Sequence, residues 1–183
     1  MDALSRIKEH YKNNWSAFSE YKLEKGLFNE LPKEFTVLKF KPRKKRNMWT
    51  YATCGMSPEK DINKIELHIF SGKENDFLIE LLAALTHYHN TGSKLNWGHS
   101  VNFGCPWAKD SNCSYGLISL PYLDGEKLEN LYVGKLFVRF LWLIPITKEE
   151  FEYKKVNGLD ALENLFEKNK LNYIDALRES IVK

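Results

Sequence analysis

The residues best suited to chemistry gather in one stretch, residues 85–107, with the sequence LTHYHNTGSKLNWGHSVNFGCPW. It contains three of the five histidines, two of the five tryptophans and one of the three cysteines. Imidazole and thiolate groups bind zinc, and imidazole transfers protons, so the stretch raises the question of a metal or catalytic site. The alternative is a turn that joins two buried elements.

Spacing argues against a metal site in this stretch. His87 and His89 close a predicted helix and lie about 200° apart around its axis, so they cannot face one metal ion. Both belong to the last helical turn, where the helix dipole favours a cationic side chain. His99 and Cys105 are about 20 Å apart along an extended strand, and Cys105 and Cys113 lack zinc-site spacing. We therefore expect no bound metal.

An enzymatic alternative rests on the sequence GHSVN, residues 98–102. Some metal-dependent nucleases use a histidine after glycine as general base and a following asparagine as metal ligand, which would make His99 catalytic. No Asp-Arg pair precedes the glycine here, and neither a G-x-S-x-G nucleophile nor a glycine-rich phosphate loop occurs. We predict no catalytic residue and no cofactor, and keep a small nuclease using His99 as the alternative.

Charge is unevenly distributed along the chain. The formal net charge of +3 is too small to make nucleic acid the expected main partner. Six cations fall within residues 39–46, and without them the chain keeps 21 of its 27 basic residues against 24 acidic ones. This basic run lies between two predicted strands. We interpret it as a solvated hairpin loop, with a phosphate- or acid-binding patch as the alternative.

The cysteine count and the lengths of the apolar runs indicate in which cellular compartment the protein is expected. Three cysteines, an odd number without a C-x-x-C pair, suit a reducing cytosol better than a disulfide framework. The first residues, MDALSRIKEHYKNNW, are charged and lack the apolar core of a signal peptide. The longest apolar run, LFVRFLWLIPI, is too short to span a bilayer and contains Arg139 and Pro145. We expect a soluble, cytoplasmic protein with no membrane partner.

Hydrophobic periodicity predicts a single α+β domain over residues 1–183, with one mixed sheet of about six strands flanked by helices. A helix over residues 2–20 opens the chain, and the clearest helix covers residues 76–90, with Leu81 and Leu85 on its buried stripe. The nearly all-apolar run 135–146 is expected to pass through the centre of the sheet. The remaining predicted elements are strands at 34–40, 48–54, 64–70, 99–104 and 115–121 and two short final helices, around 159–166 and 174–181.

Three aromatic residues lie in or beside predicted loops: Trp97, Trp107 and Tyr122. Such residues are either partly buried anchors of the core or members of a protein interface, where Trp, Tyr and Arg dominate the binding energy. Both interpretations stay open from the sequence. The candidate partner-binding residues are Trp97, His99, Trp107, Tyr122, Arg43, Lys44, Lys45 and Arg46.

Several short stretches follow one another along the chain: FTVLKFKP, WTYATCGMS, IELHIF, the helix end ALTHYH, LNWGHSV, ISLPYL, LIPIT with Glu150 after it, and GLDALENLF. In order and spacing they resemble the Suppressor of fused (SUFU) domain family, from about residue 35 to residue 182. The resemblance implies a SUFU-like mixed α/β fold and a non-enzymatic protein-binding domain. It also implies a turn at Trp97, Gly98 and His99 that positions the following strand, with His99 hydrogen-bonded.

The resemblance further implies a role. Short stand-alone members of the family look bacterial, and many resemble immunity proteins that bind and neutralise a toxin. Related immunity proteins tend to be acidic, and the net charge of +3 departs from that. We hypothesise an immunity protein that neutralises a cognate, co-encoded toxin by direct binding. A housekeeping protein-binding adaptor is a further alternative beside the nuclease, and the oligomeric state stays open.

Overall fold

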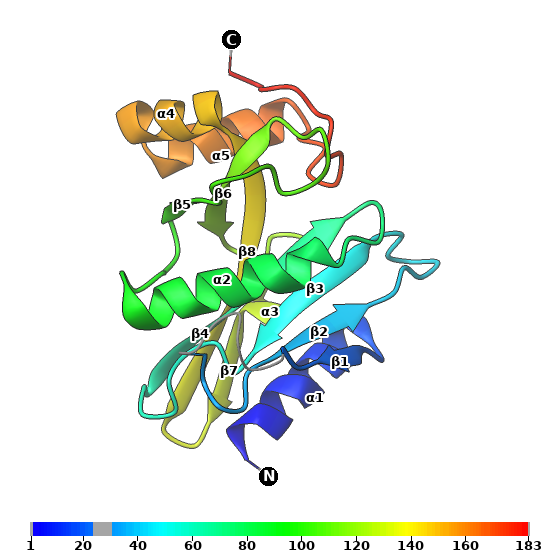
Figure 1. Cartoon of the computed structure of the whole chain (residues 1–183), viewed down its shortest axis with the longest axis vertical. Coiled ribbons are helices and arrows are strands. Elements are labelled where there is room, and N and C mark those ends of the chain that lie inside the picture. The colour runs from blue at the N-terminus through cyan, green and yellow to red at the C-terminus, as the bar shows by residue number, and fades with distance from the viewer. Residues whose placement is uncertain (1, 24–30, 183) are drawn as a thin grey trace.

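The computed structural model describes residues 2–23 and 31–182, and there eight strands form one mixed sheet (Figure 1). The strands are β1 Ser19–Tyr21, β2 Thr36–Phe40, β3 Trp49–Cys54, β4 Asn63–Ser71, β5 Ser100–Asn102, β6 Cys113–Ser119, β7 Asn130–Val133 and β8 Leu136–Thr147. Their spatial order is β1-β2-β3-β4-β8-β6-β5, and β7 pairs with β8 beside this path. The β4–β8 pair is parallel and the other pairs are antiparallel.

Helices cover both faces of this sheet. They are α1 Ala3–Trp15, α2 Phe77–Thr91, α3 Glu126–Glu129, α4 Lys148–Asn157 and α5 Leu159–Lys168. The leucines of α2 pack into the core on one face, and the buried residues of α1 and α5 pack into the core on the other. Figure 1 shows α2 crossing the strands on the near side and α4 and α5 stacked at the C-terminal end. The predicted α+β class with a mixed, helix-flanked sheet is confirmed, with more strands than the six expected.

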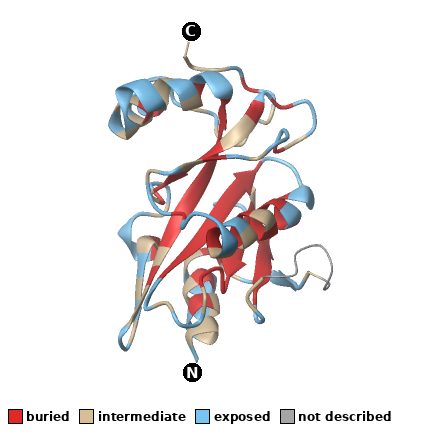
Figure 2. Ribbon diagram, turned by 60° about the vertical axis from the view of Figure 1, so that its left-hand side comes forward, coloured by how far each residue is buried: buried red, intermediate tan, exposed pale blue. Residues whose placement is uncertain are grey.

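β8 is the central strand of the sheet. It pairs with β4 on one side, and with β7 and then β6 on the other. Side chains alternate along it: Leu141 and Leu143 enter the core beneath α2, while Phe140 and Ile144 enter the core beneath α1 and α5. Buried residues accordingly run along the central strands in Figure 2, while the helices expose their outer faces. The prediction that the apolar run 135–146 passes through the sheet centre is confirmed.

β8 extends beyond its parallel partner. Pairing with β4 ends at Trp142, so residues 143–147 have no strand neighbour on that side. The backbone N–H and C=O groups of every second residue of β8 point to the β4 side. The first of these residues is Phe137, whose N–H donates to the Ile62 carbonyl at 2.9 Å. Pro145 occupies such a position and has no N–H that would need an acceptor. Its carbonyl accepts a hydrogen bond from Nη2 of a distant side chain, Arg178, at 2.9 Å.

Arg178 and Glu150 form a buried ion pair that anchors the C-terminal tail, residues 169–182. Nη1 lies 2.6 Å from Oε1 and Nη2 lies 2.6 Å from Oε2, and both side chains are almost entirely buried. Glu150 also completes a capping box with Thr147 at the start of α4, and Oε1 accepts the N–H of Ile181 at 3.1 Å. One carboxylate therefore joins the end of β8, the start of α4 and the tail.

The predicted helix over residues 174–181 is wrong, because the tail forms turns and bends. The helical pattern placed Leu177 in the core, but Leu177 is exposed and Arg178 is buried in its stead. The pairing with Glu150 decides which tail side chain points inward, and hydrophobic periodicity does not report on it.

The ends of other elements also differ from the predictions. The first helix stops at Trp15 because Ser16 adopts φ +93° and its N–H closes onto the Lys12 carbonyl at 2.8 Å. The predicted range 2–20 therefore includes the start of β1. The helix α4 was not predicted, because Glu150 is its buried residue and its apolar pattern is weak. The short strands β1 and β7 were missed as well.

Candidate functional site

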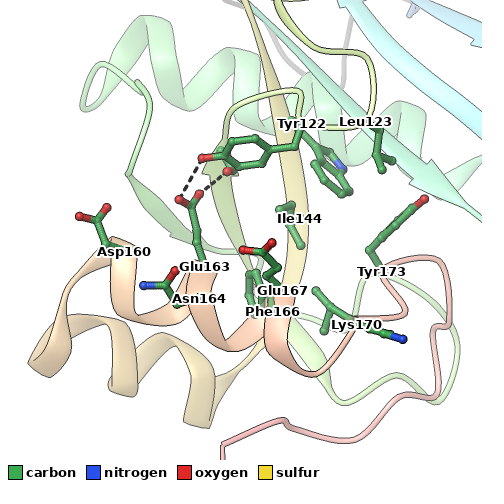
Figure 3. A pocket seen from close by; sticks show the side chains of 13 residues that line it. Tyr122, Leu123, Ile144, Asp160, Glu163, Asn164, Phe166, Glu167, Lys170 and Tyr173 are labelled. Carbon is green, nitrogen blue, oxygen red and sulfur yellow. Dashed lines mark hydrogen bonds between the residues drawn. The ribbon is translucent and has the colours of Figure 1, made fainter.

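A groove opens between α5 and the segment that follows β6 (Figure 3). Its volume is about 830 Å³. Trp142 and Ile144 of β8 form its floor, and the tail contributes Leu171 and Tyr173. Tyr173 packs edge-on against Trp142, with ring centroids 4.9 Å apart. The full lining is Ser119, Tyr122, Leu123, Trp142, Ile144, Asp160, Glu163, Asn164, Phe166, Glu167, Lys170, Leu171 and Tyr173.

The helix α5 has one apolar face and one acidic face. Leu162 and Phe166, four residues apart, are buried in the core shared with α1. Asp160, Glu163 and Glu167 line the groove at intervals of three and four residues, which stacks them along one side of the helix. In the part of the chain that the structure describes, none of these three acids forms an ion pair. Even with Lys170 in its lining, the groove therefore carries a net negative charge.

Glu163 connects α5 to the opposite wall of the groove. One carboxylate oxygen accepts a hydrogen bond from Ser119 Oγ, and the other accepts from the Tyr122 hydroxyl at 3.0 Å (Figure 3). Partial burial of the phenol and the nearby charge of Glu163 raise the pKa of Tyr122, so the hydroxyl stays protonated and continues to donate. Tyr122 is thus held in place although 56% of its surface is exposed.

The wall that carries Tyr122 and Leu123 is braced from behind by Arg46. Its guanidinium donates to both carboxylate oxygens of Asp124, at 2.6 and 3.1 Å, and stacks over the rings of Trp15 and Phe70. Trp15 Nε1 donates to the same carboxylate at 2.8 Å. Asp124 directly follows the two wall residues, so these contacts position the wall.

Residues 43–46 of the basic run form the predicted hairpin, whereas Lys39 lies in β2, where it is buried and pairs with Glu74 and Asp76. Arg43 and Arg46 exchange two backbone hydrogen bonds of 2.8 Å around Lys44 and Lys45, which are exposed at the tip together with Arg43. Arg46 departs from the predicted solvated loop, because its charge is satisfied by Asp124. Arg46 was a candidate partner-binding residue, and in the structure it supports the groove from inside.

Trp97, Gly98 and His99 form the predicted turn. The His99 N–H donates to the Asn96 carbonyl at 3.1 Å, and Gly98 adopts φ +79°, the left-handed value that a type II turn needs at this position. The Gly98 N–H donates to the Ile118 carbonyl at 2.8 Å and so fixes the turn beside β6. The hydrogen bonds of His99 come from its backbone, and its side chain is exposed.

The structure does not gather the three predicted aromatics on one surface. Trp97 is 41% exposed and lies against the Arg139 guanidinium, 5.5 Å from it. Arg139 and the groove-floor residue Trp142 point to opposite faces of β8, so Trp97 lies on the other side of the sheet from Tyr122. Trp107 is only 1% exposed and packs in the core beneath α2, so it offers no surface to a partner, contrary to the prediction.

His89 is a neutral buried side chain, and the prediction of a cation favoured by the helix dipole is wrong for it. The Leu95 N–H donates to His89 Nδ1 at 2.9 Å, so the ring proton belongs on Nε2, which lies 3.4 Å from Ser57 Oγ. Burial and the positive charge of Lys94 lower the pKa of His89 to about 4. The imidazole stabilises the loop after α2 as a hydrogen-bonding group.

Glu66 is a second buried acid that the sequence did not reveal. It accepts hydrogen bonds from Thr53 Oγ1 at 2.5 Å, from the Gly55 N–H at 2.8 Å and from the Met56 N–H at 3.3 Å. Burial raises the pKa of this carboxyl to about 7, although the three donors act in the opposite direction. Glu66 is fully enclosed, so its role is to hold the turn at Gly55, where φ is +87°.

Two kinds of feature are absent from the described residues. No three His, Cys, Asp or Glu side chains among residues 2–23 and 31–182 form a group that could hold a metal ion. No helix in the same ranges is long and apolar enough to cross a membrane.

Sequence reasoning missed the acidic face of α5. The signal was present in residues 158–167, since Asp160, Glu163 and Glu167 recur at spacings of three and four residues beside the apolar stripe of Leu162 and Phe166. A row of acidic residues on a helix is usually a solvated face. The acidic face of α5 forms the side of a groove because it lies beside the loop after β6.

Comparison with known proteins identifies the family. The family model described as Suppressor of fused protein (SUFU) matches residues 32–179, which is most of the chain. The chain belongs to the SUFU family. The matched region of this SUFU chain includes the groove, Glu150 and Arg178, whereas α1 and β1 precede it.

Relatives of this SUFU protein include bacterial chains of similar length. An uncharacterized protein of Ureaplasma parvum serovar 3 is 26% identical over 168 residues, covering 84% of this chain and 82% of that protein. The crystal structure of a SUFU homolog from Neisseria gonorrhoeae has a TM-score of 0.87 and 29% identity, covering 100% of this chain and 98% of that one.

Two further structures share the SUFU fold at 14% identity. A chain of the Sufu–Fu complex has a TM-score of 0.73, covering 97% of this chain and 91% of that one. Drosophila Suppressor of Fused has a TM-score of 0.70, covering 97% of this chain and 50% of that one. The predicted SUFU-like fold is confirmed by these likenesses.

Proposed function

We propose that this SUFU chain is a non-enzymatic protein-binding domain that acts by direct contact with a partner protein. The groove beside α5 is the observation that supports this most. It is an open surface with a braced wall, on which Tyr122 and Leu123 are exposed. Aromatic side chains beside a pocket commonly supply most of the binding energy of a protein interface.

A structural relative supports the same class of function. One of the structures that share the fold comes from a complex, that of Sufu with Fu. At 14% identity this likeness concerns the fold, so the partner of the present chain is a separate question.

Within this class we propose an immunity role, in which the chain binds a toxin encoded beside it and blocks it by occlusion. Neutralising a lethal protein requires tight binding, and a nanomolar Kd corresponds to about 12 kcal/mol. Tyr122 is the proposed anchor of that interface. Trp97 and His99 form a second exposed patch, and the hairpin cations Arg43–Lys45 form a salt-sensitive rim that mainly affects the association rate.

The test is identification of a direct partner. The tagged chain is expressed in its native host and crosslinked, and captured proteins are identified by mass spectrometry. Each candidate is then purified and titrated against the purified chain. We expect one candidate to bind directly, and, if it is a toxin, co-expression of the chain to restore growth of cells that produce it. A direct partner without toxicity would replace the immunity role by an adaptor role, and the absence of any direct partner would refute the protein-binding function.

A separate assay addresses the nuclease alternative. Purified wild type and His99→Ala are incubated with DNA and Mg²⁺, and we expect no cleavage by either. Cleavage by the wild type that is lost in His99→Ala would show that the chain is a nuclease.

A further inference from the structure

We infer that the groove beside α5 receives a segment of the partner protein in which an arginine or lysine side chain lies next to a large apolar side chain. This inference rests on the proposed protein-binding function and specifies the chemistry of its partner.

The charge of the groove selects a cation. Among the described lining residues, Asp160, Glu163 and Glu167 face the groove against a single lysine, Lys170, although the whole chain has a net charge of +3. Figure 3 shows the Glu163 carboxylate pointing from α5 toward Tyr122 on the opposite wall, with Asp160 and Lys170 at the two ends of the row. Acids three and four residues apart on a helix repel each other, so a bound cation would relieve an unfavourable interaction already present in the free protein.

The hydrogen bonds that Glu163 accepts do not neutralise its charge. Its hydrogen-bond donors, Ser119 and Tyr122, are neutral hydroxyl groups. They hold the carboxylate in one orientation without compensating its charge. A guanidinium can donate two parallel hydrogen bonds to a carboxylate, and such charge-assisted bonds are roughly twice as strong as neutral ones.

The rest of the groove selects an apolar neighbour for that cation. Trp142 and Ile144 form the floor, and Tyr122 and Leu123 stand exposed on the wall. A large aliphatic or aromatic side chain fits this surface, and the Tyr122 ring can also stack against the cation. A partner segment with both features would contact the floor and the acidic face together.

The groove is organised before anything binds. Leu162 and Phe166 fix α5 on the core, Glu163 fixes Tyr122, and the Arg46–Asp124 pair fixes the wall behind it. A site built from fixed side chains loses little conformational entropy on binding, which favours affinity.

The same features disfavour other ligands. Phosphate groups of nucleic acids would be repelled by the three acids, because nucleic acids bind through lysine and arginine. The three carboxylates are spread along α5, and among the described residues no group of three such side chains could hold a metal ion.

A random 12-residue peptide library displayed on phage, selected on the immobilised full chain, tests the inference. We expect the enriched peptides to contain arginine or lysine beside leucine, phenylalanine or tryptophan. One enriched peptide is then synthesised with a fluorescent label, and its Kd is measured by anisotropy. We expect Glu167→Lys to weaken binding by about ten-fold or more, and a peptide with its cation changed to glutamate to regain affinity for that variant.

Glu80→Lys is the matched control. Glu80 is exposed on α2, which covers the opposite face of the sheet, so the same charge change there should leave the Kd within about two-fold of wild type. Thermal melts check that each variant is folded. Glu167→Gln removes the charge with little change of shape and is used if Glu167→Lys does not fold.

The inference is overturned if no peptide is enriched over the bare support. It is equally overturned if the enriched peptides lack a cation, or bind Glu167→Lys and Tyr122→Ala as they bind wild type. These outcomes are distinct from failure of the proposed function. A cellular partner that binds the groove variants as tightly as wild type would support the protein-binding function and refute this binding site. Peptides that bind the groove specifically, without any direct cellular partner, would support the site and refute the protein-binding function.

Discussion

Replacing Arg178 by methionine measures what the buried ion pair contributes to the fold. Methionine keeps part of the aliphatic volume but removes the guanidinium, which makes two contacts of 2.6 Å with Glu150 and donates to the Pro145 carbonyl at 2.9 Å. Glu150 is fully buried, so the variant leaves a carboxylate inside the protein without its counter-charge. Breaking such a pair from one side costs about 3–5 kcal/mol.

This loss is a large share of the free energy of unfolding, which is roughly 5–15 kcal/mol for a typical protein. For a chain of this length each kcal/mol changes the Tm by about 2–4 °C, so we expect the Tm to fall by about 6–20 °C. Urea unfolding followed by circular dichroism measures the free-energy change. Hydrogen exchange at the Ile181 amide provides a local measurement, because that N–H donates to Glu150 and should exchange faster in the variant.

Two further variants make the measurement specific. Arg6→Met breaks an exposed pair with Glu9, whose N···O distance is 3.2 Å, and should cost less than about 1 kcal/mol. Adding Glu150→Gln to Arg178→Met removes the buried charge and should restore about 1 kcal/mol or more. An Arg178→Met variant that loses no more stability than Arg6→Met would refute the conclusion that this pair anchors the tail.

Four other outcomes are expected. Leu81→Ala should destabilise the chain by about 2–5 kcal/mol in urea unfolding, because Leu81 lies on the buried face of α2. Trp107→Ala should cost about 3–5 kcal/mol while Trp97→Ala costs clearly less, and equal losses would contradict the assigned burial. The folded pKa of Glu66, about 7, exceeds its ordinary 4.5, so folding takes up a proton and this contribution to stability is lost as the pH rises from about 4.5 to about 7. Glu66→Gln should abolish that component when urea midpoints at pH 5 and pH 8 are compared with wild type. The folded pKa of His89, about 4, is below its ordinary 6.5, so its contribution falls as the pH drops through that interval. Nitrogen NMR at pH 5.5 should still show the neutral ring with its proton on Nε2.

Local patterns determined much of this fold. Runs of apolar, aromatic and β-branched residues placed β2, β3, β4, β6 and β8 within a few residues of their observed ends, because a strand with two buried faces must carry apolar residues on both. The apolar spacing of α2 likewise identified its buried leucines. The ordered motifs from FTVLKFKP to GLDALENLF identified the SUFU family, which the family match then confirmed.

Other features depend on which segments meet, and the tertiary structure alone decided them. Arg178 is buried because Glu150, 28 residues earlier, lies at the uncovered end of β8. Arg46 supports the groove because Asp124 lies beside it, although the local sequence predicts a solvated cation. Trp107 is buried because its loop folds back onto the sheet. The acids of α5 form one side of a groove because the loop carrying Tyr122 lies opposite them. Periodicity reports which face of an element is apolar, whereas the partner of a polar side chain is set by contacts between residues far apart in the chain.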